Sequence, residues 1–277
     1  MRPTVSISTP NAGSRILGFG SKRGERIIPN DEIIEPIQSS DEWIRRRTGI
    51  ITRTYAAPED TAVSLATAAA HDALDNTGLD GSDIDVVIVS TVTHFEQTPS
   101  AAAQVADAIG ATPAAAFDIS AACAGYCYGI AQADALVRAG MATHVLVVGA
   151  EKMSDFIDPT DRSISFILGD GGGATIIGPS DTPEISRTVW GSDGSQAATI
   201  GQTHSWLTLR DGSDMSWPTL RQEGPTVFKW AAFSMARVAR DIIAAAGLAP
   251  EDIDVFIPHQ ANMRIIDQMV KTARLRP

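Results

Sequence analysis

Apolar positions along the chain follow two periods in turn. In Asp60–Thr77 they recur every three or four residues, with Val63 and Ala70 on the same side, which predicts an amphipathic helix ending at Gly78. Ile84–Thr91 (IDVVIVST) is a β-branched run without helical period, which is typical of a strand. Because helix and strand patterns keep alternating, we expect βαβ units and a largely parallel sheet.

The same patterns predict further elements. Ala114–Ser120 is an apolar run that suits a buried strand, and the helix from Ala122 onward is apolar on every side, so we expect it to be buried all round. The loop at about Gly194–Pro225 is long for a compact domain, which favours a functional loop or a substrate cover. Further strands are expected at Arg15–Gly20, His144–Ala150, Gly171–Gly178, Glu184–Gly194 and Ile253–Pro258, and helices at Asn30–Gln38, Ser39–Ile50, Ser100–Ile109, Val227–Ala246 and Asn262–Ala273.

An internal repeat indicates the architecture. The segment His71–Val89 matches Arg240–Pro258 at seven positions, all at a constant offset of 169 residues. We therefore predict two similar α/β halves, at residues 1–180 and 181–277. The same offset places the copy of the strand and helix around Cys123 after Pro277, so the second half is expected to be incomplete.

The composition argues against several classes of protein. The chain has 277 residues, 44% of them hydrophobic, and a net charge of −11, which argues against nucleic acid as the main partner. The N-terminus has no apolar signal segment, and no stretch approaches the length of a membrane span. Two cysteines in one helix do not form a disulfide framework. These features favour a cytoplasmic protein.

Cys123 lies where the predicted strand Ala114–Ser120 becomes a helix. Free backbone N–H groups and the helix dipole favour a thiolate there, and small neighbours leave room for an acyl chain, so Cys123 is a candidate nucleophile. A buried hydrophobic role is the alternative. Cys127, one turn later, is expected to be core, because the helix holds no histidine to complete a metal site and the spacing is not CxxC.

Five motifs occur in order: DEWIRRRTGI, FDISAACAG, DRSISFILGDGGGA, VFKWA and FIPHQANMRII. With them the chain from Arg15 onward resembles β-ketoacyl-acyl-carrier-protein synthase III, the condensing enzyme that starts type II fatty-acid synthesis. The resemblance implies an α/β thiolase-like fold of two βαβαβ halves in five layers, here with the second half incomplete. It also implies a homodimer with the Phe95–Pro99 loop near the partner, acyl-CoA and malonyl-acyl-carrier protein as substrates, and no cofactor or metal.

The resemblance assigns roles to single residues. Cys123 would take the acyl group as a thioester, and His259, after a predicted strand end, would donate to the malonyl thioester oxygen as a neutral imidazole. Without the resemblance His259 could equally be a buried structural histidine, the interpretation kept for His71, His94, His144 and His204. Thr98, where acetyl-preferring members have a bulky Phe, predicts a deeper acyl pocket.

The remaining assignments concern coenzyme A and the carrier protein. Trp43 and Arg162 would flank the adenine, with Arg47 near the phosphates and Phe228 and Asn262 along the pantetheine arm. Trp43 could otherwise be a half-buried anchor. The resemblance places the contacts with the acidic carrier protein at three basic residues, Lys229, Arg264 and Lys271.

The chain departs from the family pattern at its C-terminal end. The third catalytic residue, an Asn in a GNTSAAS motif, and a terminal glycine-rich turn have no counterpart before Pro277. Two alternatives stay open. One is an acyl-CoA synthase or acyltransferase of a polyketide pathway, which would use the same Cys and His on a different acceptor, and the other, suggested by the missing Asn, is a non-catalytic acyl-CoA-binding or partner-subunit protein. A papain-like protease also places His downstream of Cys, but the sequence has neither its CGSCW-type site nor a secretory context.

Overall fold

The computed structural model describes residues 10–276, which form two compact units interleaved along the chain. The first contains the chain up to Glu25, Ala56–Lys152 and Asp170–Ser186, and the second contains Arg26–Tyr55, Met153–Gly169 and the chain from Arg187 onward. A single cut near residue 180 does not reproduce this division, because Arg26–Tyr55 and Met153–Gly169 belong to the second unit.

A five-stranded sheet forms the centre of the first unit, in the order β1-β7-β6-β4-β5. β4 pairs in parallel with both β5 and β6, whereas β7 is antiparallel to both β1 and β6. The sheet is therefore mixed, and the expectation of a largely parallel one was wrong for its β1 side. The strands are β1 (Gly13–Arg23), β4 (Val86–Ser90), β5 (Ala115–Ile119), β6 (Val145–Lys152) and β7 (Asp170–Ser180).

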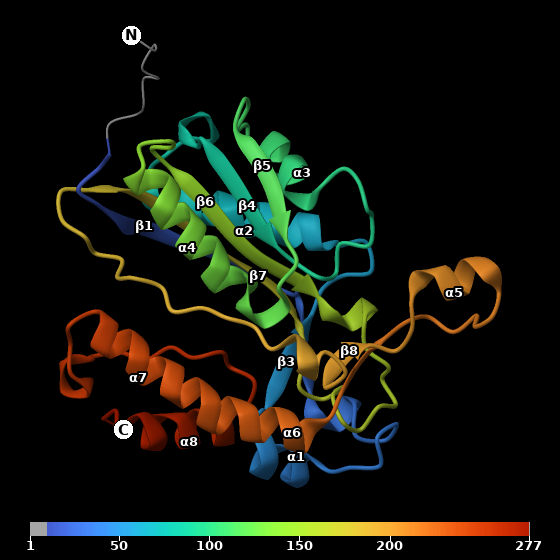
Figure 1. Ribbon diagram of the computed structural model, residues 1–277. Coiled ribbons are helices and arrows are strands. Elements are labelled where there is room, and N and C mark those ends of the chain that lie inside the picture. Colours follow the sequence, from blue (N-terminus) through green and yellow to red (C-terminus); the bar gives the residue numbers. More distant parts are fainter. Residues whose placement is uncertain (1–9, 277) are drawn as a thin grey trace. The chain divides into compact units, whose positions relative to one another are not determined.

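Helices cover both faces of this sheet (Figure 1). Successive side chains of a strand point to opposite faces. In β4, Val87 and Val89 pack with residues of α2 (Ala62–Thr77) and α3 (Ala101–Ala108), and Ile88 packs with residues of α4 (Gly125–Arg138). The core of the unit thus lies on both sides of β4, as its uninterrupted apolar run predicts.

Two burial predictions were wrong in this unit. β5 is the edge strand of the sheet, so its residues are exposed or half-buried instead of buried. α4 packs on one face of the sheet only, and its outward side remains accessible. Cys127 lies on that side and is exposed, so it is not a core residue.

The second unit consists of helices and two short hairpin-like sheets. Its elements are β2 (Arg26–Pro29) paired with β3 (Thr52–Tyr55), α1 (Asp41–Thr48), β8 (Ile200–Gln202) paired with β9 (Leu220–Gln222), α5 (Trp206–Asp211), α6 (Gly224–Lys229), α7 (Ala236–Ala245) and α8 (Met263–Ala273). A π-helical turn, Trp230–Met235, joins α6 to α7, so the predicted helix at Val227–Ala246 is confirmed. α7 and α8 lie side by side through apolar contacts (Figure 1).

Two predicted strands are absent from the described residues. Glu184–Gly194 and Ile253–Pro258 belong to none of the sheets, and the latter runs irregularly from a short helical turn to α8. Ile253 and Phe256 pack against α7 and α8, whereas Val255 and Ile257 are exposed. A strand needs a neighbour to pair its backbone groups, and β-branched sequence alone does not supply one.

Candidate functional site

Cys123 occupies a tight turn at the carboxyl end of β5. It is the middle residue of a 3-10 turn, Ala122–Ala124, directly before α4. Ala122 has a φ of 44°, a left-handed conformation that non-glycine residues rarely adopt and that often marks functional turns. Gly125 follows, and a Cβ there would lie 1.9 Å from the hydroxyl oxygen of Ser90 at the end of β4. The missing side chain of Gly125 therefore lets the Cys123 turn pack against β4.

The electrostatic environment of Cys123 differs from the sequence expectation. Solvent reaches the side chain, yet the surrounding protein raises the pKa of the Cys123 thiol by desolvation. The backbone N–H of Cys123 lowers this pKa, and the charge of Glu151 raises it further. Desolvation outweighs the backbone N–H of Cys123, so the protein shifts the pKa of this thiol in the direction opposite to the one predicted.

Thr98 lies in the loop between β4 and α3, in the same unit as Cys123, and its side chain is exposed. One end of this loop is tied to the other, since the Nε2 atom of His94 lies 3.1 Å from the carbonyl oxygen of Pro99. The other predicted site residues all belong to the second unit.

Trp43, Arg47 and Arg162 come together in the second unit. The guanidinium carbons of Arg47 and Arg162 lie 5.1 Å and 4.9 Å from the centre of the Trp43 ring, within the range of cation–π attraction. Arg47 is one turn after Trp43 on α1, whereas Arg162 comes from a distant segment, so only the folded chain joins them. Trp43 is half-buried and also contacts Phe166 edge to face, with ring centres 5.3 Å apart. Trp43 is thus the half-buried anchor that the sequence offered as one alternative, and its contact with the adenine stays a prediction.

Arg53 supports this cluster, a role that sequence reasoning missed. Its buried guanidinium donates to Oδ1 of Asn30 at 2.6 Å and to the carbonyl oxygen of Phe166 at 3.1 Å. The side chain of Asn30 in turn donates to Asp41 at the start of α1, at 2.7 Å. Burial lowers the pKa of Arg53, and these acceptors replace the lost water. The available signal was an arginine within a four-residue strand.

His259 lies in the irregular segment before α8, not at a strand end as predicted. Its side chain is accessible, but desolvation by nearby protein lowers the pKa of His259, which favours the neutral imidazole. Asn262 caps α8, because its Oδ1 accepts from the N–H of Ile265 at 2.9 Å. This bond occupies the oxygen of Asn262 and leaves its amide N–H groups for other partners.

Arg264, a predicted carrier-protein contact, lies against a residue predicted to contact coenzyme A. Its guanidinium carbon lies 5.4 Å from the ring centre of Phe228, a predicted pantetheine contact. Arg264 and Lys271 lie seven residues apart on α8, which is about two turns, so they project from the same side. Lys229 ends α6, and all three basic side chains are exposed.

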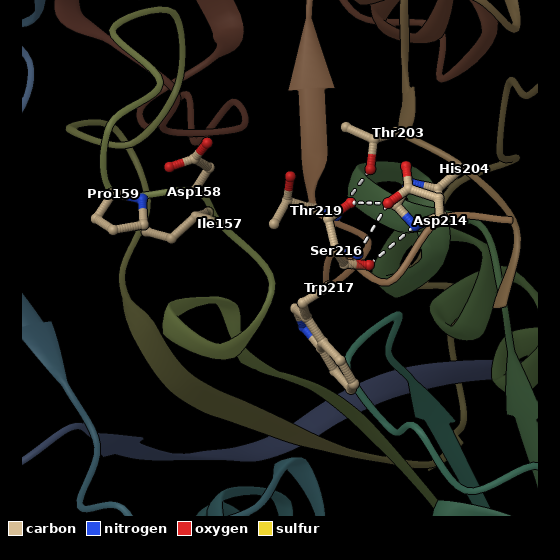
Figure 2. A pocket seen from close by; sticks show the side chains of 9 residues that line it. All are labelled: Ile157, Asp158, Pro159, Thr203, His204, Asp214, Ser216, Trp217 and Thr219. Atoms are coloured by element: carbon tan, nitrogen blue, oxygen red, sulfur yellow. Dashed lines mark hydrogen bonds and ion pairs between the residues drawn. The ribbon is translucent and has the colours of Figure 1, made fainter. Parts of the chain in front are cut away.

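A surface hollow of the second unit lies elsewhere (Figure 2). It measures about 540 Å³ and is lined by none of the predicted site residues. His204 joins two segments of its wall: the Nε2 atom of His204 lies 3.0 Å from the carbonyl oxygen of Ser216, and its Nδ1 atom lies 3.8 Å from the carboxylate of Asp214. The segment predicted as a long loop thus contains regular structure: β8 and β9 pair with each other, and α5 lies between them in the chain.

Residues 10–276 offer neither a metal-binding cluster nor a membrane-spanning helix. Within that range no three His, Cys, Asp or Glu side chains gather in a way that could hold a metal ion. None of the helices there has both the length and the apolar character that crossing a membrane requires.

Comparison with known proteins identifies the family. The family model for 3-oxoacyl-[acyl-carrier-protein] synthase III matches residues 117–194, and the model for its C-terminal domain matches residues 243–277. The chain is 53% identical to the β-ketoacyl-[acyl-carrier-protein] synthase III of Kocuria rhizophila, over 98% of this chain and 83% of the relative. It is 51% identical to synthase III 1 of Streptomyces coelicolor, again over 98% and 83%.

Solved structures agree with this assignment. A priming β-ketosynthase from a polyketide biosynthetic pathway matches with a TM-score of 0.95 and 41% identity, over 99% of this chain and 82% of that one. The 3-oxoacyl-(acyl carrier protein) synthase III of Pseudomonas aeruginosa matches with a TM-score of 0.86 and 32% identity, over 95% and 81%. The predicted thiolase-like fold is therefore confirmed. The chain belongs to the 3-oxoacyl-[acyl-carrier-protein] synthase III family, the condensing enzymes that initiate fatty-acid synthesis from an acyl-CoA primer and malonyl-acyl-carrier protein.

Proposed function

We propose that this chain carries out its family's condensation with Cys123 as the nucleophile. The sulfur attacks the carbonyl carbon of the acyl-CoA thioester, the coenzyme A thiol leaves, and the acyl group stays on Cys123. The malonyl carboxylate then leaves as CO₂, and the electron pair of the broken C–C bond attacks the acyl carbonyl carbon, which releases the Cys123 sulfur. Splitting the reaction at a thioester replaces one difficult step by two easier ones.

His259 supports the second half of this reaction. Loss of CO₂ leaves an enolate whose oxygen carries negative charge, and a hydrogen-bond donor aimed at it stabilises the transition state. The lowered pKa of His259 supports a neutral imidazole, which can donate this bond without adding a charge. Both reactants arrive as thioesters and decarboxylation supplies the carbanion, so the proposed chemistry needs no cofactor.

The cluster of Trp43, Arg47 and Arg162 is the observation that carries the proposal for coenzyme A. Two arginines held on one indole ring offer a planar surface for a purine and charge-assisted donors for phosphates. We place the pantetheine arm along Phe228 and Asn262, and the acidic carrier protein against Lys229, Arg264 and Lys271. Cytoplasmic location and a homodimer complete the proposal, and sedimentation of the purified chain tests the latter.

Intact-mass spectrometry tests the nucleophile. The purified chain is incubated with acetyl-, isobutyryl- or octanoyl-CoA, and the expected result is one acyl adduct that Cys123→Ala abolishes and Cys127→Ala retains. The acyl-CoA that reacts fastest shows which acyl length the pocket prefers, and this tests the deeper pocket expected from Thr98. If folded protein forms no adduct with any of the three, the catalytic assignment fails and the non-catalytic acyl-CoA-binding alternative gains.

Arg46 provides a matched control for the coenzyme A site, because it neighbours Arg47 on α1, whereas the guanidinium groups over the Trp43 ring are those of Arg47 and Arg162. We expect Arg47→Ala and Arg162→Ala each to raise the KM for acyl-CoA by roughly ten- to a hundredfold, from the loss of charge-assisted bonds. Arg46→Ala should leave KM within about twofold. Equal effects of all three variants would show that only the general positive charge matters.

A second candidate function, priming of a polyketide pathway, is supported by the structural match to a priming β-ketosynthase. The two functions share the acylated cysteine and differ in the carrier protein that accepts the acyl group. Condensation rates with malonyl-loaded carriers of each kind separate them, and faster reaction with a polyketide carrier would favour the second function.

A further inference from the structure

Arg53 on β3 takes no part in the proposed reaction, yet it donates to three acceptors around the Trp43 cluster. Arg53 is only 7% exposed. Its Nη1 atom donates to the carbonyl oxygen of Ile28 at 3.1 Å, and its Nη2 atom donates to Oδ1 of Asn30 at 2.6 Å and to the carbonyl oxygen of Phe166 at 3.1 Å. The planar guanidinium holds these acceptors in a fixed arrangement, which the flexible ammonium group of a lysine does not reproduce.

Asn30 connects Arg53 to both ends of α1. It is buried, and its amide nitrogen donates to Oδ1 of Asp41, the first residue of α1, at 2.7 Å. The same nitrogen donates to the carbonyl oxygen of Ile50, just after the helix, at 2.9 Å. Because the oxygen of Asn30 accepts from Arg53, its amide hydrogens are directed to these two acceptors. The position of α1 is therefore tied to the guanidinium of Arg53.

The two sides of the Trp43 cluster are both bonded to this guanidinium. Trp43 and Arg47 belong to α1, on one side. On the other side, Arg162 lies four residues before Phe166, whose ring contacts Trp43 and whose carbonyl oxygen accepts from Arg53. The guanidinium carbons of Arg47 and Arg162 lie 5.1 Å and 4.9 Å from the centre of the Trp43 ring. These two distances depend on where α1 and the Phe166 segment lie relative to each other, and Arg53 holds both.

Arg53 differs from the arginines of the cluster in its exposure. Arg47 and Arg162 are exposed, whereas Arg53 is buried, so any effect of Arg53 on a ligand has to pass through the residues that it positions. The Nε atom of Arg53 is buried and has no hydrogen-bond partner among residues 10–276. An unpaired buried donor lowers stability. The side chain thus fixes positions through its two terminal nitrogens while it loses a hydrogen bond at the third.

We propose that Arg53 is a positioning residue for coenzyme A: it sets the spacing of the two guanidinium groups over the Trp43 ring, and with it the affinity for the adenine and phosphates. This inference rests on the proposed coenzyme A site at Trp43, Arg47 and Arg162. A spacing that is fixed before the ligand binds reduces the cost of ordering these side chains on binding. The effect of Arg53 therefore falls on binding and not on the transfer of the acyl group to Cys123.

Titration calorimetry with coenzyme A tests the inference, because binding is read without any reaction. Arg53→Lys keeps the charge and removes the planar fork, and we expect it to raise the dissociation constant of coenzyme A roughly tenfold. Arg26→Lys is the matched control. Arg26 lies on β2, the strand paired with β3, and its guanidinium pairs with Glu32 at 3.2 Å on the surface. The same chemical change there should leave the dissociation constant within about twofold.

Acylation of Cys123 by two donors separates positioning from a general loss of structure. Acetyl-CoA carries the adenine and phosphates, whereas acetyl-pantetheine lacks them. Arg53→Lys should raise the half-saturating concentration of acetyl-CoA roughly tenfold, with the maximal rate little changed, and should leave the rate with acetyl-pantetheine within about twofold. Equal losses with both donors would overturn the inference, because a merely distorted protein reacts more slowly with either one.

Asn30→Asp is a second variant, which decides the question should Arg53→Lys fail to fold. It keeps the acceptor for Arg53 and turns a carboxylate oxygen toward Asp41 and the carbonyl oxygen of Ile50, so the link to α1 becomes repulsive. Binding of coenzyme A should weaken as in Arg53→Lys. Unchanged affinity in either folded variant would overturn the inference, as would an equal loss in Arg26→Lys.

The same measurements distinguish this inference from the proposed function. Weaker coenzyme A binding in Arg53→Lys, without any acyl adduct in the parent protein, would support the inference and reject Cys123 as the nucleophile. An acyl adduct in the parent together with unchanged affinity in Arg53→Lys would do the opposite. A parent protein that binds no coenzyme A would reject the proposed site and this inference with it.

Discussion

The two copies of the internal repeat share their local structure and differ in what surrounds them. α2 ends at Gly78 with a φ of 68°, and the equivalent helix α7 is followed by Gly247 with a φ of 74°. After each glycine a carboxylate closes a short helical turn, with Asp83 accepting from the N–H of Asp80 at 2.9 Å and Asp252 from that of Ala249 at 2.8 Å. Up to this point the two copies are alike.

The two copies differ in the residues that follow these turns. Val86–Ser90 becomes β4, with strands on both sides, whereas the equivalent stretch around Ile257 pairs with no strand of the described chain. Ile88 is 0% exposed and its counterpart Ile257 is 80% exposed. Helix caps and turns depend on a few neighbouring residues, so they recur with the sequence. A strand depends on partners distant in the chain, so it does not.

The largest expected difference between the copies is in the burial of these isoleucines. Ile88→Ala leaves a cavity between the sheet and α4 and should cost about 2–5 kcal/mol, whereas Ile257→Ala should stay within roughly 0.5 kcal/mol. Hydrogen exchange of the β4 amides follows the first unit, and all five tryptophans lie in the second, so their fluorescence in urea follows Ile257→Ala. Similar losses for both variants would mean that Ile257 is buried in solution.

A smaller difference is expected at the start of the short helical turns. Gly81 packs so closely that a Cβ would lie 1.7 Å from the carbonyl oxygen of Ile109. Gly81→Ala should therefore cost about 1–3 kcal/mol, because backbone has to move. The equivalent Pro250→Ala should cost roughly 0.4–1 kcal/mol through greater freedom of the unfolded chain. Urea unfolding monitored by circular dichroism compares the two, and the contrast fails if Gly81→Ala is the milder change.

The helix ends should show the smallest difference, because there the copies are equal. Neither Gly78 nor Gly247 has an atom within 4 Å of the position of an added Cβ, so the cost of alanine is backbone strain alone. We expect Gly78→Ala and Gly247→Ala each to cost about 1 kcal/mol, measured by the same unfolding titrations. A cost at one position that exceeds the other by more than about twofold would show that the copies already differ at this level.

The candidate site shows the same division between local and distant determinants. The sequence located the turn of Cys123 and the helix that begins after Asn262, since each depends on residues within one or two turns. It did not reveal that Arg53 holds the segment under Trp43, or that desolvation and Glu151 outweigh a helix terminus at Cys123. Those effects come from residues on other strands, and no local pattern records them.

The sequence by itself determined the ends of the longer helices, the glycine caps, the order of the family motifs and thus the chemistry to expect. Each follows from spacing, backbone preference or side-chain type within a short window. The helix predicted at Asn30–Gln38 was wrong, because only a 3-10 turn, Asn30–Glu32, and further turns form there. Tertiary structure alone decided the rest: β5 as an exposed edge, Ile253–Pro258 without a strand and the raised pKa of Cys123. Burial and charge at a residue are properties of everything that packs around it, and only the folded chain brings those groups together.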